Sequence, residues 1–232
     1  MKKLLFIDNQ GDHLWPTTML DLFSDSGFET EYIIANQNQL PTDLSHFQCI
    51  FLSGSVLSPY DDLTWIHKEH ELIQSATKKN IPILGSCFGS QILASALCGK
   101  NQVFRRGQCE VGYVWIALHH SSNDPILRNT PEKVRMFVWH NDEIKADHKD
   151  MIILGSSTDC PNHVWRFKDK PVWGIQGHPE LNGEQVLKVL ENYRDFFTRD
   201  KADFDEIRKK AGDNTQAIKL IKNFIAYCNN EI

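Results

Sequence analysis

The chain has 232 residues, of which 41% are hydrophobic and 24% are charged. A chain of this length and composition can bury a substantial core, which excludes an intrinsically disordered protein. Its formal net charge of -5 provides no basic surface for nucleic acid or for an anionic membrane. We therefore expect the protein to bind a small molecule or another protein.

The first apolar stretch, residues 4–7, is followed at once by Asp8 and is too short for a signal peptide. No apolar run approaches the roughly 20 residues that a membrane helix needs, so we expect a cytoplasmic protein. The chain has six cysteines but no CxxC pair, and we expect free thiols and no structural zinc site. The cysteines are Cys49, Cys87, Cys98, Cys109, Cys160 and Cys228.

The first half of the chain alternates short apolar runs with segments of helical periodicity. The apolar runs are rich in β-branched or large residues and each ends near Gly, Asn or Asp, which predicts strands. They cover residues 3–7, 31–34, 49–53 and 81–84. Residues 17–26 and 65–79 have the spacing of amphipathic helices. This alternation predicts an α/β fold, a doubly wound and mostly parallel sheet with helices on both faces.

The middle of the chain contains strand-like runs with little helical sequence between them, which favours an antiparallel portion of the sheet or a β-rich lobe. These runs cover residues 109–118, 134–140, 151–156, 163–167 and 172–176. Amphipathic stretches follow at residues 183–198, 203–210 and 215–227, so we expect C-terminal helices from about residue 183. Since there is no repeat or linker-like stretch, a single domain over residues 1–232 is the default interpretation.

A tight turn around Cys87 joins the fourth predicted strand to a segment of helical character that continues up to Gly99. Gly85 and Gly89 lie two residues before and after Cys87, which leaves room for the strained geometry of a nucleophile elbow. At a helix N-terminus the helix dipole and free N–H groups favour thiolate over thiol. The alternative is a small buried cysteine in a βα turn that the glycines merely shape, and this turn alone does not decide between them.

The second motif is the triplet His178, Pro179, Glu180, which directly follows the last predicted strand. In extended backbone a spacing of two places both side chains on the same side, where the carboxylate can fix the imidazole tautomer. Taken alone, the triplet is explained more often by a surface turn. Together with the Cys87 turn it indicates a Cys-His-Glu triad, because both motifs follow strand ends, where α/β sheets carry their active sites.

At these motifs the chain resembles the class I glutamine amidotransferases, in which a GxCxGxQ elbow and a later HPE supply the triad. The two motifs lie here at residues 85–91 and 178–180. Residues 51–55 look like the oxyanion strand of that family, and residues 139–144 look like its substrate-side loop. Finer features at residues 59–62 and 110–112 are similar to the stand-alone GMP synthase-like branch.

The resemblance implies a flavodoxin-like fold over most of the chain, with Cys87 as nucleophile, His178 as base and Glu180 as orienting carboxylate. It also implies an oxyanion hole formed by the N–H of Phe88 and that of Ser55 or Gly54. Ser55 stands where the family often has a second glycine, so a non-glycine residue must tolerate the conformation that this donor needs.

The resemblance further implies that Gln91 and the loop residues His140, Asn141 and Asp142 bind substrate. No metal or organic cofactor is implied. Although the chain has ten histidines, no HExxH or comparable spacing appears, so solvated or core histidines are the first explanation for them.

Three functions remain open on the sequence alone. The first is a glutaminase that releases ammonia from glutamine for a synthetase, and the second is a hydrolase of γ-glutamyl peptides that acts alone. The third is a non-catalytic domain that binds a ligand or a partner, against which the intact triad counts. Only about fifty residues follow Glu180 and no GxxxxGK[ST] loop occurs, so we expect any synthetase to be a separate protein chain.

Overall fold

The computed structural model describes residues 2–11, 17–37, 40–120, 123–212 and 216–231. Over these residues it forms a nine-stranded sheet in the order β2-β1-β3-β4-β9-β8-β7-β5-β6. The strands are β1 (Lys2–Asp8), β2 (Phe28–Ile34), β3 (Cys49–Leu52), β4 (Ile83–Ser86), β5 (Val103–Leu118), β6 (Lys133–Ile144), β7 (Met151–Ser156), β8 (Val164–Phe167) and β9 (Val172–Ile175).

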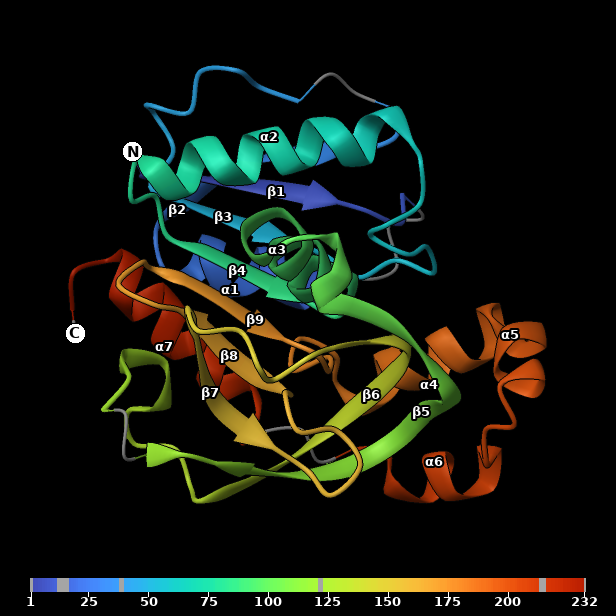
Figure 1. Cartoon of the computed structure of the whole chain (residues 1–232). Coiled ribbons are helices and arrows are strands. Elements are labelled where there is room, and N and C mark those ends of the chain that lie inside the picture. Colours follow the sequence, from blue (N-terminus) through green and yellow to red (C-terminus); the bar gives the residue numbers. More distant parts are fainter. Residues whose placement is uncertain (1, 12–16, 38–39, 121–122, 213–215, 232) are drawn as a thin grey trace.

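The first five strands in this order pair in parallel, whereas every pairing from β9–β8 onward is antiparallel. The α-helices are α1 (Thr17–Asp25), α2 (Thr64–Lys78), α3 (Phe88–Cys98), α4 (Gly183–Asn192), α5 (Arg194–Arg199), α6 (Phe204–Lys210) and α7 (Ile218–Cys228). Figure 1 shows α2 and α3 in front of the parallel strands and α1 and α7 behind them. The predicted doubly wound fold with an antiparallel portion is therefore confirmed.

Alternation along β1 explains why both faces of the sheet are covered. Leu4 and Phe6 join one apolar cluster with residues of α1 and α7, while Leu5 and Ile7 join the other with residues of α2 and α3. Since successive side chains of a strand point to opposite faces, a continuous apolar run such as residues 4–7 requires helices on both sides.

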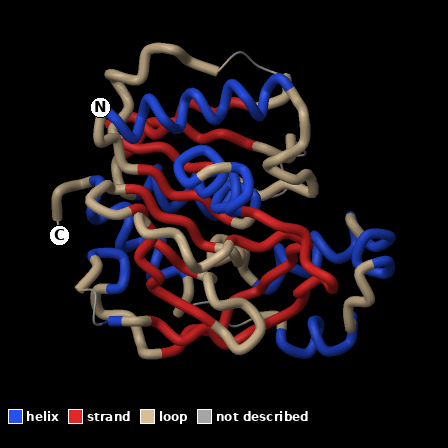
Figure 2. Tube along the Cα trace, viewed as in Figure 1, coloured by secondary structure: helices blue, strands red, loops and turns tan. Residues whose placement is uncertain are grey.

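A third apolar cluster lies where α4, α5 and α6 pack against the long β5–β6 hairpin. Its centre is Trp139 on β6, whose ring stacks on that of Phe197 on α5 with the centroids 4.2 Å apart. Figures 1 and 2 show these helices gathered beside one end of the hairpin, away from α7. The cluster fixes α5 next to the strand that carries residues 139–144.

The structure differs from the sequence-based boundaries in several places. β2 begins at Phe28 and not at residue 31, and β4 covers Ile83–Ser86 and not residues 81–84. The hairpin strands extend beyond the predicted runs, because polar residues such as Arg105 and Asp142 still pair across the ladder. The predicted helix over residues 183–198 is interrupted at Tyr193, which leaves helical geometry (φ -112°, ψ 26°) and packs its ring on Trp139. The start of the last predicted helix, at residue 215, lies outside the described residues, and α7 begins at Ile218.

Two sequence-based expectations concern thiols and membranes. All six cysteines are free thiols, as expected. Among the helices that the structure describes, none has both the length and the apolar character needed to cross a bilayer.

Candidate active site

Cys87 lies at the sharp turn between β4, which ends at Ser86, and α3, which begins at Phe88. Its backbone has φ 51° and ψ -111°, in the positive-φ region that non-glycine residues rarely adopt. Backbone strain of this kind persists only where the surroundings enforce it, and it gathers at functional sites. The turn has the geometry of a nucleophile elbow.

The two glycines that flank Cys87 are required by close backbone contacts. A Cβ on Gly85 would lie 2.4 Å from the carbonyl oxygen of Gly89, and a Cβ on Gly89 would lie 2.2 Å from the carbonyl oxygen of Leu52. Because neither space admits a methyl group, α3 can approach β3 and β4 this closely only with glycine at both positions. The GxCxG spacing is thus a packing requirement of the turn.

His178 reaches the same place from the neighbouring strand. β9 pairs in parallel with β4, and the Cys87 N–H donates to the carbonyl oxygen of Ile175, the last residue of β9, at 2.8 Å. Three residues later, the His178 N–H donates to the carbonyl oxygen of Phe137 on β6 at 2.8 Å. Adjacent parallel strands therefore bring the two motifs together at the carboxyl edge of the sheet.

Glu180 holds the imidazole from the side away from the thiol. His178 Nδ1 lies 2.8 Å from Glu180 Oε1, and both residues are buried. Ser86 Oγ lies 2.9 Å from each oxygen of the Glu180 carboxylate and 3.1 Å from the Gly177 carbonyl oxygen. Because the carboxylate accepts from Nδ1, the Nε2 atom of His178 is the one left to serve the thiol.

The charge state of His178 follows from its neighbours. Burial by itself lowers the pKa of His178, but the Glu180 carboxylate and the charge and hydrogen bonding of Cys87 outweigh it and raise that pKa to about 10. The imidazole is therefore stabilised in its protonated form next to the sulfur.

A pocket opens at Cys87 and His178. Its wall includes Ser55, Gln91 and Trp139, and the Cys87 thiol lies 3.5 Å from the Trp139 carbonyl oxygen. Gly54 is packed so closely here that a Cβ on it would lie 3.0 Å from His178 Cε1 and 3.5 Å from Cys87 Cβ.

The predicted oxyanion donors lie around this pocket. Phe88 begins α3, so its N–H is among the first-turn donors that have no partner within the helix. Gly54 and Ser55 follow β3, the strand next to β4. Ser55 is not among the residues with positive φ, so the side chain at this position causes no backbone strain in this conformation.

The predicted substrate residues of β6 form one wall of the pocket, and their side chains are engaged by the protein. His140 Nδ1 lies 2.9 Å from the Asp142 carbonyl oxygen and its Nε2 lies 2.7 Å from Glu110 Oε2. Asn141 Nδ2 donates to Asp200 Oδ2 at 3.1 Å. Gln91 Nε2 donates to the Asp142 carbonyl oxygen at 2.9 Å.

The Asp142 carboxylate connects this wall to the loop after β3. It accepts hydrogen bonds from Ser58 Oγ and, at 2.8 Å, from Tyr60 Oη, and it lies 3.5 Å from Arg105 Nη1. This network ties the segment after the oxyanion strand to the end of β6.

Sequence reasoning missed the residues at the mouth of the pocket. Arg105 comes from β5, and Phe196 and Arg199 come from α5. Asp200 follows α5 and accepts from both Trp139 Nε1 and Asn141 Nδ2, at 3.0 and 3.1 Å. No motif marks these positions, because Arg105 reaches the pocket through the pairing of β5 with β6 and the others reach it through the packing of α5 on β6.

Comparisons with known proteins identify the family of the chain. The family profile described as "Glutamine amidotransferase class-I" matches residues 19–194. The glutamine-hydrolyzing GMP synthase of Porphyromonas gingivalis strain W83 is 30% identical over 193 residues, which are 79% of this chain and 37% of that protein. The chain thus spans a little over a third of that relative. A glutamine-hydrolyzing GMP synthase subunit from Picrophilus torridus is 29% identical over 82% of this chain and 96% of its own.

Solved structures show the same fold. A glutamine amidotransferase of Thermotoga maritima superposes with a TM-score of 0.85 at 23% identity, covering 98% of this chain and 97% of that one. A glutamine amido transferase of Methylobacillus flagellatus gives a TM-score of 0.86 at 19% identity, covering 100% and 96%. With a family profile that spans most of the sequence, including Cys87 and His178, the chain belongs to the class I glutamine amidotransferase family.

Proposed function

We propose that this protein hydrolyses the side-chain amide of glutamine through a γ-glutamyl thioester on Cys87 and releases ammonia. The proposal rests on one observation: Cys87, His178 and Glu180 lie together just beyond the ends of the adjacent strands β4 and β9, with His178 Nδ1 2.8 Å from Glu180 Oε1. An elbow cysteine, an imidazole and an orienting carboxylate are the parts that acyl transfer to water requires.

The reaction proceeds in two acyl-transfer steps. His178 holds the proton that came from the Cys87 thiol, since Glu180 and Cys87 stabilise the imidazolium. Cys87 Sγ attacks the amide carbon as the thiolate, and the imidazolium delivers its proton to the leaving nitrogen, so that ammonia departs and the thioester forms. His178 then takes a proton from water, whose oxygen attacks the thioester carbon and releases glutamate and the Cys87 thiol. The N–H groups of Phe88 and of Ser55 or Gly54 stabilise each oxyanion, by roughly 3 to 4 kcal/mol per donor in other enzymes.

The substrate occupies the pocket beside Cys87. Gln91 and the β6 residues His140, Asn141 and Asp142 form the wall that positions it, largely through backbone atoms, since their side chains are held within the protein. No step in this scheme calls for a metal or an organic cofactor.

We infer that the ammonia passes to a synthetase on a separate chain. The names of relatives of similar length support this, since the Picrophilus torridus protein, 96% of which the match covers, is named as one subunit of a GMP synthase. A second candidate function is hydrolysis of a larger γ-glutamyl compound. The arginines Arg105 and Arg199 at the mouth of the pocket favour it, because they suit a carboxylate beyond the γ-glutamyl group.

Steady-state release of ammonia and glutamate by the purified protein tests the proposal. We expect glutamine to be cleaved and the Cys87→Ala variant, purified free of other glutaminases, to show no turnover. Equal activity in the wild type and in Cys87→Ala would contradict the proposed mechanism. Brisk cleavage of a γ-glutamyl peptide with glutamine ignored would favour the second candidate.

Labelling with a glutamine-mimicking electrophile tests the nucleophile separately. We expect Cys87 to react first, because it alone among the cysteines lies at the pocket beside a base. Burial raises the pKa of Cys98 and that of Cys109 to about 12, which disfavours their thiolates. Faster labelling of another cysteine, read by mass spectrometry of the peptides, would contradict the assignment.

A further inference from the structure

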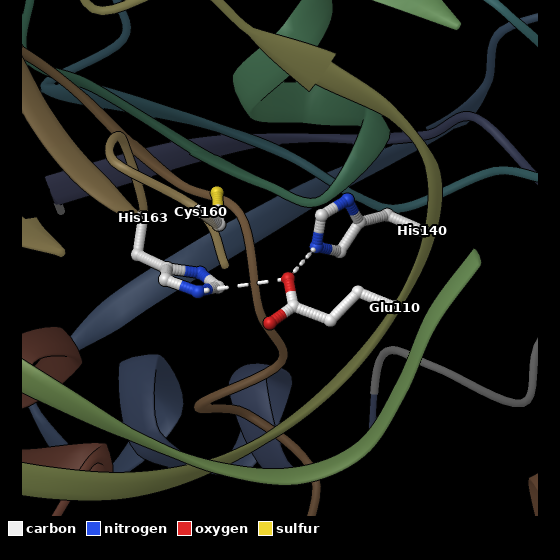
Figure 3. Close-up of side chains that lie close together, drawn as sticks. All are labelled: Glu110, His140, Cys160 and His163. Carbon is white, nitrogen blue, oxygen red and sulfur yellow. Dashed lines mark hydrogen bonds and ion pairs between the residues drawn. The ribbon is translucent and has the colours of Figure 1, made fainter. Parts of the chain in front are cut away.

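A second group of ionisable side chains lies next to the pocket wall. It consists of Glu110, His140, Cys160 and His163, which lie close together (Figure 3), with contacts from Glu110 to both histidines. Of its four members only His140 also lines the pocket, and the proposed chemistry does not use the other three. All four are buried, and one ligand atom of each lies within 4.8 Å of those of the others. A thiol, two imidazoles and a carboxylate are the donors that bind transition metals in proteins.

The four residues come from three segments that the fold brings together. Glu110 on β5 is paired directly with His140 on β6, so both side chains lie on one face of the hairpin. Cys160 and His163 lie in the connection between β7 and β8. The His163 backbone fixes this connection, because its N–H donates to the Gly155 carbonyl oxygen at 2.9 Å and its carbonyl accepts from Gln176 at 2.7 Å.

The charged side chains around the cluster do not repel a cation strongly. Arg106 lies 4.0 Å from Glu110 Oε2, but its guanidinium is in closer contact with the Glu143 carboxylate, which neutralises it. The four donors carry two negative charges once Cys160 is a thiolate, and a divalent ion would balance them. Burial raises the pKa of the Cys160 thiol, so the thiol keeps its proton without an ion, and a divalent ion would displace that proton as it binds.

We propose that Glu110, His140, Cys160 and His163 form a binding site for a divalent transition metal, for which Zn²⁺ has the best-matched coordination. Four protein ligands of this kind form a closed tetrahedral site, typical of structural zinc. Such a site has no open position for substrate, so the metal would join the β5–β6 hairpin to the β7–β8 connection and take no part in amide hydrolysis.

The environment of the ligands is the one that metal sites require. His140 Nδ1 lies 2.9 Å from the Asp142 carbonyl oxygen. Because a carbonyl oxygen can only accept, Nδ1 carries a hydrogen, and Nε2 points to the cluster. Metal-binding histidines are commonly oriented in this way by a backbone carbonyl. Burial raises the pKa of the Cys160 thiol, and the hydrogen bond from the Asn162 backbone N–H offsets only part of that rise. His163 Nδ1, although buried, has no hydrogen-bond partner among the described residues.

The ligand atoms, which lie within 4.8 Å of one another, would have to draw together by up to about an ångström. Tetrahedral ligands of Zn²⁺ lie about 3.3 to 3.8 Å from one another, given bonds of roughly 2.0 to 2.3 Å. The present separation of His163 Nε2 and Glu110 Oε2, 3.7 Å, lies within that range. The His140–Glu110 contact of 2.7 Å is a hydrogen bond when His140 Nε2 carries a second proton. A metal ion would displace that proton, and the contact would open by roughly an ångström or less. Ser157 Oγ, which lies 3.0 Å from His163 Nε2, would give up that contact to the ion.

Cobalt titration of the metal-stripped full chain tests the proposal. The Cys87→Ala variant is the background protein, so that the Cys87–His178 pair cannot supply a thiolate ligand and the result does not depend on activity. We expect one equivalent of Co²⁺ per chain, the visible bands of a four-coordinate ion and a sulfur-to-cobalt charge-transfer band, and we expect Zn²⁺ to displace the cobalt. Binding below one equivalent, or six-coordinate spectra, would overturn the proposal.

Two added substitutions assign the ligands. Cys160→Ser should abolish the charge-transfer band and weaken Zn²⁺ binding by at least about tenfold. Cys109→Ser is the matched control, because Cys109 is the neighbour of Glu110 on β5 and its side chain lies on the opposite face of the strand. Retention of the band in Cys160→Ser, or its loss in Cys109→Ser, would contradict the site.

Thermal unfolding with and without Zn²⁺ is a second readout that does not rely on sulfur spectroscopy. A ligand that binds only the folded state raises its stability, so the background protein should gain in Tm with added Zn²⁺. The Glu110→Gln variant should gain markedly less, since it keeps the shape of the side chain and loses its charge. An equal gain in both proteins would place the metal elsewhere.

Discussion

At the scale of single residues, Glu180 has the most specific geometry of the candidate site. Its carboxylate meets His178 Nδ1 at 2.8 Å and is supported by Ser86 Oγ at 2.9 Å. An amide here offers an N–H to the imidazole as readily as an oxygen, so it no longer fixes one tautomer. We expect Glu180→Gln to lower kcat by roughly 10²- to 10⁴-fold, with a residual rate. Glu184→Gln, at an exposed position of α4, is the control and should keep full activity.

The pKa of His178 provides a second test at this scale. Burial lowers it, while Glu180 and Cys87 raise it, with a net value of about 10. Removing the sulfur in Cys87→Ala takes away one of the raising contributions, so the pKa of His178 should fall. NMR titration of the imidazole in wild type and variant measures the difference. Equal values would mean that Cys87 does not interact with the imidazole.

Glu69 on α2 provides a pH-dependent test of stability. Burial raises its pKa to about 8, only partly offset by the hydrogen bond from Asn9 Nδ2 at 3.3 Å. Because this folded-state pKa lies above the unfolded value of 4.5, the contribution of Glu69 to stability is present below pH 4.5 and is lost as pH rises through 8.

Between pH 5 and pH 8, ionisation of Glu69 should lower the free energy of unfolding of the wild type by about 3 kcal/mol. The Glu69→Gln variant should not show this decrease. Urea unfolding of wild type and variant at the two pH values measures it. Glu71→Gln, exposed on the same helix, is the control and should follow the wild type. An unchanged pH dependence in Glu69→Gln would assign the loss to other groups.

At the scale of elements, the approach of α3 to β3 is what places Cys87 at the end of β4. A Cβ on Gly89 would lie 2.2 Å from the Leu52 carbonyl oxygen, a backbone atom that cannot rotate away. We expect Gly89→Ala to lower the free energy of unfolding by roughly 2 to 4 kcal/mol and to reduce activity as the turn shifts.

Gly107→Ala is the matched control for this substitution. Gly107 lies in the irregular part of β5, has no positive φ, and a Cβ on it would meet no atom within 4 Å. Its unfolding curve in urea should match the wild type within about 0.5 kcal/mol. Similar losses in both variants would mean that the contact with Leu52 is not the cause.

At the scale of the whole molecule, the pocket joins parts that are far apart in the sequence. Cys87 and His178 come from the parallel core, the β6 wall comes from the antiparallel hairpin, and Arg199 comes from α5. Asp200 connects the last two, because it accepts from Trp139 Nε1 and Asn141 Nδ2. The β6 wall of the pocket therefore depends on how α5 packs against it.

We expect Asp200→Ala to lower kcat/KM about tenfold, mainly through KM, because two hydrogen bonds to a charged acceptor are lost at the wall and not at the reacting atoms. Asp205→Ala, whose side chain is fully exposed on α6, is the control and should be neutral. Steady-state kinetics separates the two parameters. An unchanged KM in Asp200→Ala would mean that α5 does not shape the pocket.

The sequence by itself determined the parts of this protein whose signals are local. Alternating apolar runs predicted the strands of the parallel core, since one strand buried on both faces leaves a continuous run such as residues 4–7. Glycine spacing predicted the turn at Cys87, because only residues without a Cβ fit against Leu52 and against the helix itself. His178 Nδ1 and Glu180 Oε1 lie 2.8 Å apart, but Pro179 and Glu180 form a turn, so this contact does not arise from the extended backbone that the sequence argument assumed.

Only the tertiary structure decided which distant residues meet. The break at Tyr193 has no glycine or proline signal and follows from the packing of its ring on Trp139. Phe196, Arg199 and Asp200 reach the pocket wall through the same packing. The cluster of Glu110, His140, Cys160 and His163 left no spacing motif, because strand pairing and the β7–β8 connection bring its members together. Such contacts depend on long-range packing free energy, which a local pattern of residues does not encode.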